Sequence, residues 1–157
     1  MDRARAGAVG RCLLVVIPLW ASHARAQEGG PPAAVPPVLR NGPAETACVD
    51  GRPRTVYREP LAPAMRAELE VHEQVHRAQL AGDCERTLQA IVADRHRYAE
   101  AETEAGCAQL EATVTEPGRH AYALGMLSGW LRDRFPELAA DTLNAMIARR
   151  CGTWRRA

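Results

Sequence analysis

Two histidines and a glutamate lie close together in the stretch VHEQVHRAQL, which covers residues 71–80. His72 and His76 are four residues apart, and Glu73 directly follows the first of them. On a helix, residues four apart share one face, so both imidazoles can offer a nitrogen to one metal ion. A glutamate beside the open position of a zinc ion can act as a general base. The pattern HExxH therefore predicts a zinc site with His72 and His76 as ligands and Glu73 as the catalytic residue.

The plain alternative is a pair of buried histidines that bind no metal. The expected helix carries core-facing side chains at steps of three or four residues, at Met65, Leu69, His72, His76 and Leu80. Histidines on such a face need hydrogen-bond partners whether or not a metal is present. The spacing therefore places both histidines inside the protein and leaves both interpretations open.

A catalytic zinc site needs a third protein ligand, and the segment RYAEAETEAGCAQL, residues 97–110, offers three glutamates. Glu102 falls on the apolar stripe of the expected helix, whereas Glu100 and Glu104 are each turned about 200° away at 100° per residue. A lone carboxylate in an apolar stripe is unfavourable unless it is paired or bound to a metal. Glu102 is therefore the predicted third ligand.

The order HEQVH and then ETEA, residues 102–105, resembles the gluzincin type of zinc metallopeptidase. In that family, two histidines of HExxH and a glutamate on a later helix bind zinc, and a small residue, here Ala105, follows the glutamate. The resemblance covers residues 71–110. It implies an enzyme that cleaves a peptide or protein substrate with Zn²⁺ as its cofactor. Gly106 stands where many members have an aspartate, so the usual carboxylate partner of a ligand histidine is missing.

Other features of such enzymes are less defined in this chain. The metzincin pattern HExxHxxGxxH does not fit, because Gln79 and Gly82 occupy its glycine and last-histidine positions. A donor for the oxyanion is also needed, and the candidates are Tyr98, His120 and Tyr122. Residues 55–57 form a strand that either binds an extended substrate by edge addition, as the resemblance implies, or only covers the core.

The two halves of the site can meet only if the chain folds back between them. On one straight helix from residue 83, Glu102 would lie about 28 Å beyond the turn, whereas His76 lies about 8 Å before it. We therefore expect a helix break near residues 93–95, which would return a separate helix over the HExxH helix. Without that break, Glu85 or Asp83 would be the nearer carboxylate.

The remaining sequence predicts a mainly α (α+β) fold, a zincin-like helical domain with a short N-terminal β-hairpin. The hairpin is expected within residues 47–60, where Asp50-Gly51 forms the turn. Helices are expected over residues 63–81, 83–114 in one or two pieces, 117–134 and 136–150.

The N-terminus has the features of a signal peptide over residues 1–26. Arginines precede the apolar run CLLVVIPLW, and small residues at positions 24 and 26 predict cleavage before Gln27. The run is too short to span a bilayer, so no membrane association is expected after cleavage. Residues 27–46 contain five prolines and three glycines and are expected to form a flexible leader, which leaves residues 47–157 as the metallopeptidase domain.

Charge gives no indication of a nucleic-acid partner. Removing residues 1–26 takes away four arginines and one aspartate, which changes the formal charge from +1 to −2. No basic stripe interleaved with aromatic residues remains, so nucleic-acid binding is not expected.

Four cysteines follow the predicted cleavage point, and an exported protein meets oxidising conditions, so two disulfides are expected. Cys84 and Cys107 would be about 34 Å apart on a continuous helix, far beyond the roughly 7 Å between Cα atoms that a disulfide allows. The favoured pairing joins Cys48 to Cys84 and Cys107 to Cys151. The pairing of Cys48 with Cys107 and of Cys84 with Cys151 remains open.

The sequence thus predicts an exported, periplasmic or secreted, zinc metallopeptidase that uses a zinc-activated water and a glutamate base. The main alternative is a non-catalytic, disulfide-stapled helical binding domain that retains a metal. A zinc-dependent hydrolase of a non-peptide bond is a further alternative. Substrate specificity and oligomeric state are not predicted.

Overall fold

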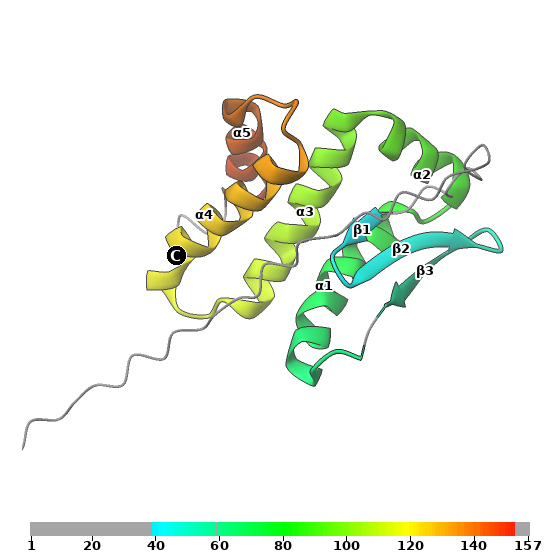
Figure 1. Cartoon of the computed structure of the whole chain (residues 1–157), viewed down its shortest axis with the longest axis horizontal. Coiled ribbons are helices and arrows are strands. Elements are labelled where there is room, and N and C mark those ends of the chain that lie inside the picture. Colours follow the sequence, from blue (N-terminus) through cyan, green and yellow to red (C-terminus); the bar gives the residue numbers. More distant parts are fainter. Residues whose placement is uncertain (1–38, 59, 153–157) are drawn as a thin grey trace, which may run out of the picture. The chain divides into compact units, whose positions relative to one another are not determined.

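The computed structural model describes residues 39–58 and 60–152. Three strands are followed by five helices (Figure 1): β1 (Leu39–Asn41), β2 (Ala44–Val49), β3 (Arg52–Tyr57), α1 (Pro63–Gln79), α2 (Cys84–Ala93), α3 (Arg95–Thr113), α4 (Pro117–Arg134) and α5 (Ala140–Arg150). The prediction of a mainly α fold with an N-terminal hairpin is confirmed. The predicted signal peptide and residues 27–38 of the predicted leader lie outside the described residues.

The strands form one antiparallel sheet in the order β1-β2-β3. Val49 pairs with Arg52 across the predicted two-residue turn, where Asp50 and Gly51 have φ angles of 52° and 74°. Positive φ at both central positions is the geometry of a tight hairpin turn, and Asp-Gly tolerates it well.

The expected start of the domain at residue 47 is wrong, because the sheet begins earlier. β1 and the first residues of β2 lie within the range assigned to the flexible leader, and Leu39, Ala44 and Thr46 are fully buried. Pairing of β2 with β3 satisfies the backbone there, and burial of these side chains outweighs the proline- and glycine-rich composition.

The expected break in the long helical region is confirmed at Asp94. Its side chain caps α3 by accepting hydrogen bonds from the backbone N–H groups of His96 and Arg97, at 2.9 and 3.2 Å. Asp94 itself is extended, with φ −111° and ψ 107°, so α2 ends before it and α3 starts after it as a separate, capped helix. Asp83 caps α2 in the same way, by accepting from the N–H of Arg86 at 3.1 Å.

The expected start of the last helix at residue 136 is wrong, because α5 begins at Ala140. Phe135 has φ −127° and ψ 60°, which lies outside the helical region. A proline follows it, and a proline disfavours helical geometry in the residue before it. The N–H of Leu138 bonds to the carbonyl of Phe135 at 3.0 Å, so residues 136–139 form a turn rather than a first helical turn.

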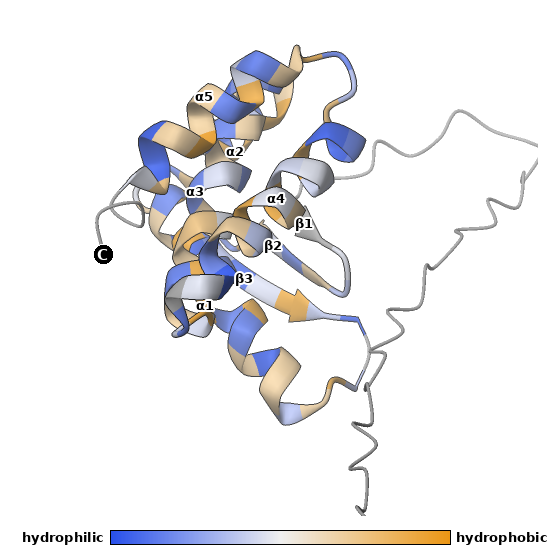
Figure 2. Cartoon of the chain, turned by 90° about the vertical axis from the view of Figure 1, so that its left-hand side faces the viewer, coloured by the Kyte–Doolittle hydropathy of each residue, from blue (hydrophilic) through white to orange (hydrophobic). Residues whose placement is uncertain are grey.

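Helix α3 is the centre of the helical part and packs against α1, α2, α4 and α5 (Figure 1). Apolar and polar residues are interspersed along the helices (Figure 2). Gly106 allows the close approach of α4, because a Cβ at this position would lie 2.6 Å from a Leu127 methyl carbon. The core includes Leu80, Leu88, Leu131, Phe135, Leu143 and Met146.

The favoured disulfide pairing is confirmed. Cys48 is bonded to Cys84 and Cys107 to Cys151, with Cα–Cα distances of 5.8 and 5.3 Å. Two disulfides are consistent with an exported protein. Within residues 39–58 and 60–152, none of the helices has the length and apolar character needed to cross a membrane.

Candidate metal centre

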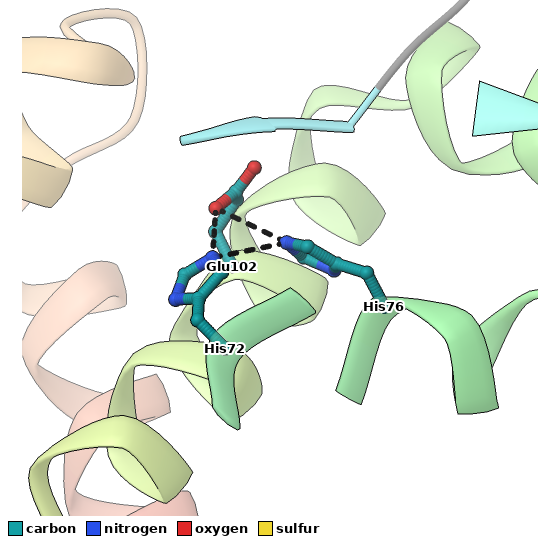
Figure 3. A group of neighbouring side chains, drawn as sticks. All are labelled: His72, His76 and Glu102. Atoms are coloured by element: carbon teal, nitrogen blue, oxygen red, sulfur yellow. Dashed lines mark hydrogen bonds and ion pairs between the residues drawn. The ribbon is translucent and has the colours of Figure 1, made fainter. Parts of the chain in front are cut away.

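The predicted metal-binding side chains meet between α1 and α3. His72, Glu73 and His76 occupy the buried side of α1, and Glu102 projects from the buried side of α3 (Figure 3). Their exposed fractions are 1, 0, 0 and 0%, respectively. The helical periodicity of the sequence therefore identified the inward-facing carboxylate correctly.

Three donor atoms converge in this group. The Nε2 atoms of His72 and His76 lie 3.1 Å apart, and Oε2 of Glu102 lies 3.3 and 3.6 Å from them, respectively. Among the described residues, this is the group of histidine, cysteine and acidic side chains that could hold a metal ion. Four-coordinate zinc with bonds of about 2.0–2.1 Å separates its ligand atoms by roughly 3.3–3.4 Å, which matches the observed spacing.

Protein hydrogen bonds do not complete this arrangement. Oε2 of Glu102 is buried and has no hydrogen-bond partner among the described residues, although it faces both imidazoles. Buried polar atoms are rarely left in that state. A metal ion bound to all three donor atoms would satisfy them together, so the residues fit the ion that HExxH predicts.

The charges of the cluster support one another. Burial alone raises the pKa of Glu102, but its close contacts with His72 and His76 outweigh that effect and lower the pKa to about 2. Burial lowers the pKa of His76, and its close contact with Glu102 reverses that effect and raises it. Glu102 is therefore held as a carboxylate, the form in which it can bind a metal.

Gln79 is the hydrogen-bond partner of the His76 ring nitrogen that faces away from the cluster. Nδ1 of His76 lies 2.8 Å from Oε1 of Gln79, whose Nε2 donates to the carbonyl of Ala101 and to Glu104 at 3.2 and 3.1 Å. With Gln79 oriented as an acceptor, Nδ1 of His76 carries the proton and Nε2 is free to bind a metal. Sequence reasoning missed Gln79, although its place three residues after His76 puts it on the same face.

Glu73 is held by the sheet. Thr46 on β2 donates a hydrogen bond from its Oγ1 to Oε2 of Glu73 at 2.6 Å, and Oγ1 of Thr46 lies 2.9 Å from Oγ1 of Thr55 on β3. Oε1 of Glu73 is buried without a hydrogen-bond partner among the described residues. Burial raises the pKa of Glu73 despite the opposing effect of Thr46. Thr46 was not predicted, because it lies in the segment expected to be flexible.

The other two glutamates of the segment point elsewhere. Glu100 pairs with Arg149 at 3.1 Å, and Glu104 contacts Gln79 and lies 3.9 Å from Arg150. Asp83, an alternative in an unbroken helix, caps α2. The choice of Glu102 over its neighbours is thus supported by the contacts of each.

Of the three candidate oxyanion donors, a contact network links Tyr98 to the cluster. The hydroxyl of Tyr98 accepts a hydrogen bond from Nη2 of Arg134 at 2.6 Å. Nη2 of Arg134 in turn lies 3.4 Å from Oε1 of Glu102. Nε2 of His120 lies 3.1 Å from the carbonyl of Val114, and Tyr122 is 72% exposed. The structure therefore brings Tyr98 toward the site and gives the other two candidates different surroundings.

A mainly apolar cavity of about 270 Å³ borders His72. It lies between α1, α3 and α4, and its walls include Leu69, Leu110, Ala123, Leu127 and Trp130. The ring of Trp130 meets that of His72 edge to face, with centroids 6.5 Å apart. The cavity is large enough for one apolar side chain of a ligand next to His72.

Chemically, the arrangement combines two imidazole nitrogens from α1 and one carboxylate oxygen from α3. A second carboxylate, that of Glu73, lies on α1 beside the two histidines. Three protein ligands are typical of catalytic zinc sites, whereas structural sites usually have four. Comparison of the chain with protein-family models, with curated proteins and with solved structures found no match.

Proposed function

We propose that the chain is an exported zinc metallopeptidase of the gluzincin type. The observation that carries the proposal is the convergence of His72, His76 and Glu102 from two separate helices, with donor atoms 3.1–3.6 Å apart. Glu73 follows the first ligand directly and is buried beside it. This is the residue set that hydrolysis with a general base requires.

A zinc ion held by these three residues would acidify a water molecule and polarise the carbonyl of the scissile peptide bond. Glu73 would act as the general base, accepting a proton from the attacking water and passing it to the leaving amine. Thr46 holds Oε2 of Glu73, which leaves Oε1 as the oxygen that accepts the proton. Its raised pKa suits a group that must first accept a proton and then release it.

The surroundings of the site support a peptide as the substrate. The cavity beside His72 suits an apolar side chain. β3 is an edge strand, and a groove of about 450 Å³ runs beside it, lined by Arg54, Thr55 and Arg77 among others. An exposed strand edge can pair with an extended peptide backbone.

Substrate entry requires a movement, because all four side chains of the site are at most 1% exposed. β1 crosses the view above the cluster in Figure 3, and its Leu39 is a fully buried member of the core. With three residues, β1 is the shortest element of the sheet. Its displacement would disturb the fewest backbone hydrogen bonds.

The decisive experiment compares the mature protein, from Gln27, with its Glu73→Gln variant. We expect about one zinc per chain in both proteins and cleavage of a broad peptide library that is about 10²–10⁴-fold slower with the variant than with the wild type. Glu68→Gln is the matched control, because Glu68 is an exposed glutamate of the same helix. Equal cleavage by wild type and Glu73→Gln would contradict the proposed role of Glu73.

Complete burial of the site favours a second candidate, a non-catalytic domain that retains a metal. In that case the wild type would bind zinc and cleave no peptide. Hydrolysis of ester substrates without peptide cleavage would instead indicate a zinc hydrolase of a non-peptide bond. N-terminal sequencing of the exported protein tests the compartment, with Gln27 as the expected first residue.

A further inference from the structure

Arg134, the last residue of α4, contacts the carboxylate of the candidate metal centre, and the proposed chemistry does not use it. Its Nη2 lies 3.4 Å from Oε1 of Glu102. The other oxygen of the same carboxylate, Oε2, faces the Nε2 atoms of His72 and His76. Oε1 of Glu102 thus contacts the guanidinium group, whereas Oε2 faces the two histidines of the candidate metal centre.

The guanidinium group is held from several sides. Nη2 of Arg134 donates to the hydroxyl of Tyr98 at 2.6 Å, and Cζ lies 5.2, 5.4 and 6.0 Å from the ring centroids of Tyr98, Trp130 and Phe135, respectively. The side chain is 24% exposed. Stacking on aromatic faces and a hydrogen bond fix an arginine far better than solvent contact does. Arg134 is therefore a positioned cation rather than a mobile surface group.

We propose that Arg134 is a positioning residue that keeps Glu102 bound to the metal through Oε2 alone. The inference rests on the proposed metal site and concerns the way in which Glu102 binds. A carboxylate can bind a metal with one or both oxygens. A second bond, through Oε1, would occupy the position that a site with three protein ligands leaves for water or substrate. A guanidinium group on Oε1 competes for that oxygen and so keeps the position open.

The test uses the full mature chain loaded with cobalt(II), whose visible absorption is stronger in four-coordinate than in five-coordinate sites. Arg134→Met removes the cation and keeps an apolar side chain against the aromatic rings. We expect its cobalt absorption to fall by about twofold or more, because Oε1 is released to the metal. Zinc affinity, measured by competition with a chromophoric chelator, should stay equal or rise by up to about tenfold, because a nearby cation is removed. Arg134→Lys keeps the charge and should retain most of the wild-type absorption.

Arg132→Met is the matched control. Arg132 is an exposed arginine of the same helix, and its Nε donates to the backbone carbonyl of Ser128 at 3.3 Å. Its loss should leave the cobalt spectrum unchanged. Tyr98→Phe removes the hydrogen bond that anchors Arg134 and should give an intermediate loss of absorption, so the inference can be tested even if Arg134→Met does not fold.

Equal absorption in wild type, Arg134→Met and Tyr98→Phe would overturn the inference. So would a loss of zinc affinity in Arg134→Met, which would indicate that Arg134 only supports the structure, or a wild type that binds no cobalt. A wild type that binds cobalt and cleaves no peptide would end the proposed peptidase function, and the spectra would still decide the role of Arg134. If peptides are cleaved, Arg134→Met should lower kcat more than it raises KM.

Discussion

Helix α1 takes part in two charged clusters that differ in one decisive respect. The outer cluster joins Tyr57, Glu70 and Arg77, and the side chains of Glu70 and Arg77 are 48% and 30% exposed. Tyr57 donates to Glu70, and Arg77 donates to Glu70 and to Thr55. In the outer cluster, the charges of Glu70 and Arg77 therefore pair with each other, and both side chains are exposed to solvent.

The inner cluster is buried and incomplete. Oε2 of Glu102, Oε1 of Glu73 and Nδ1 of His72 have no hydrogen-bond partner among the described residues. Both clusters contain a similar mixture of charges, so charge alone does not mark a site. Burial together with the convergence of three donor atoms, Nε2 of His72, Nε2 of His76 and Oε2 of Glu102, does, because such an arrangement is costly unless something binds there.

The largest effect should come from removing a ligand of the inner cluster. Glu102→Ala should reduce zinc from about one ion per chain to almost none, and His72→Ala or His76→Ala should do the same, because two remaining ligands hold zinc poorly. Glu104→Ala is the matched control and should keep its zinc. The measurement is metal analysis after dialysis, and full zinc occupancy in Glu102→Ala would show that another carboxylate is the ligand.

A smaller effect is expected from Gln79, which contacts His76 and lies outside the group of three donor atoms. Gln79→Leu removes the acceptor for Nδ1 of His76 and should weaken zinc binding by about 10–100-fold. Gln74→Leu, at an exposed glutamine of the same helix, should leave the affinity unchanged. Competition with a chelator measures both, and equal affinities would mean that the hydrogen bond does not orient His76.

Thr46 should affect turnover rather than metal content. Thr46→Val keeps the shape of the side chain and removes the hydrogen bond to Glu73, so peptide cleavage should fall by about tenfold while zinc remains bound. The hydrogen bond lowers the pKa of Glu73, so its loss should move the acidic limb of the pH–rate profile to higher pH. Thr46→Ser keeps the hydroxyl and should restore both properties. An unchanged profile in Thr46→Val would contradict this role.

The smallest effects belong to the outer cluster. Glu70→Gln should change the free energy of unfolding by about 1 kcal/mol or less at neutral pH and leave zinc binding intact. Loss of zinc in this variant would mean that the two clusters are coupled. Chelator competition and urea unfolding provide the two measurements.

Titration of Tyr57 sharpens the same comparison. Burial and the hydrogen bond to Glu70 raise its pKa from 10.0 to about 12. Between these values the unfolded chain releases the phenol proton and the folded chain keeps it, so stability should decline as pH rises from 10 to 12. Glu70→Gln should lower the pKa while burial keeps it above 10.0. Ultraviolet titration measures the change, with Tyr57→Phe to identify the signal.

Features set by spacing along one helix were predictable from the sequence. Glu102 was distinguished from Glu100 and Glu104 by their angles around α3, and the break at Asp94 followed from the need to return Glu102 to His76. The same geometry argued against a disulfide between Cys84 and Cys107, and the structure has the favoured one of the two pairings that this left open. Each of these depends on distances that a helix fixes by itself.

Contacts between elements were not predictable in this way. Thr46 reaches Glu73 only because β2 packs on α1, and Arg134 reaches Glu102 only because α4 ends beside α3. Composition misled the assignment of residues 39–46, since Gly42 and Pro43 there coexist with fully buried Leu39 and Ala44. No periodicity within one element encodes these cross-element distances.

The two disulfides also determine what a protease could do to this protein. One closes a covalent loop from Cys48 to Cys84 that contains both histidines, and the other closes a loop from Cys107 to Cys151 that contains Arg134. A single cut inside either loop leaves the fragments joined. Residues 85–106, which include Glu102, lie outside both loops, so one cut there separates the chain into two pieces. Between the two loops, the stretch in which one cut divides the chain is therefore the one that carries Glu102, and the capped, buried helix α3 covers most of it.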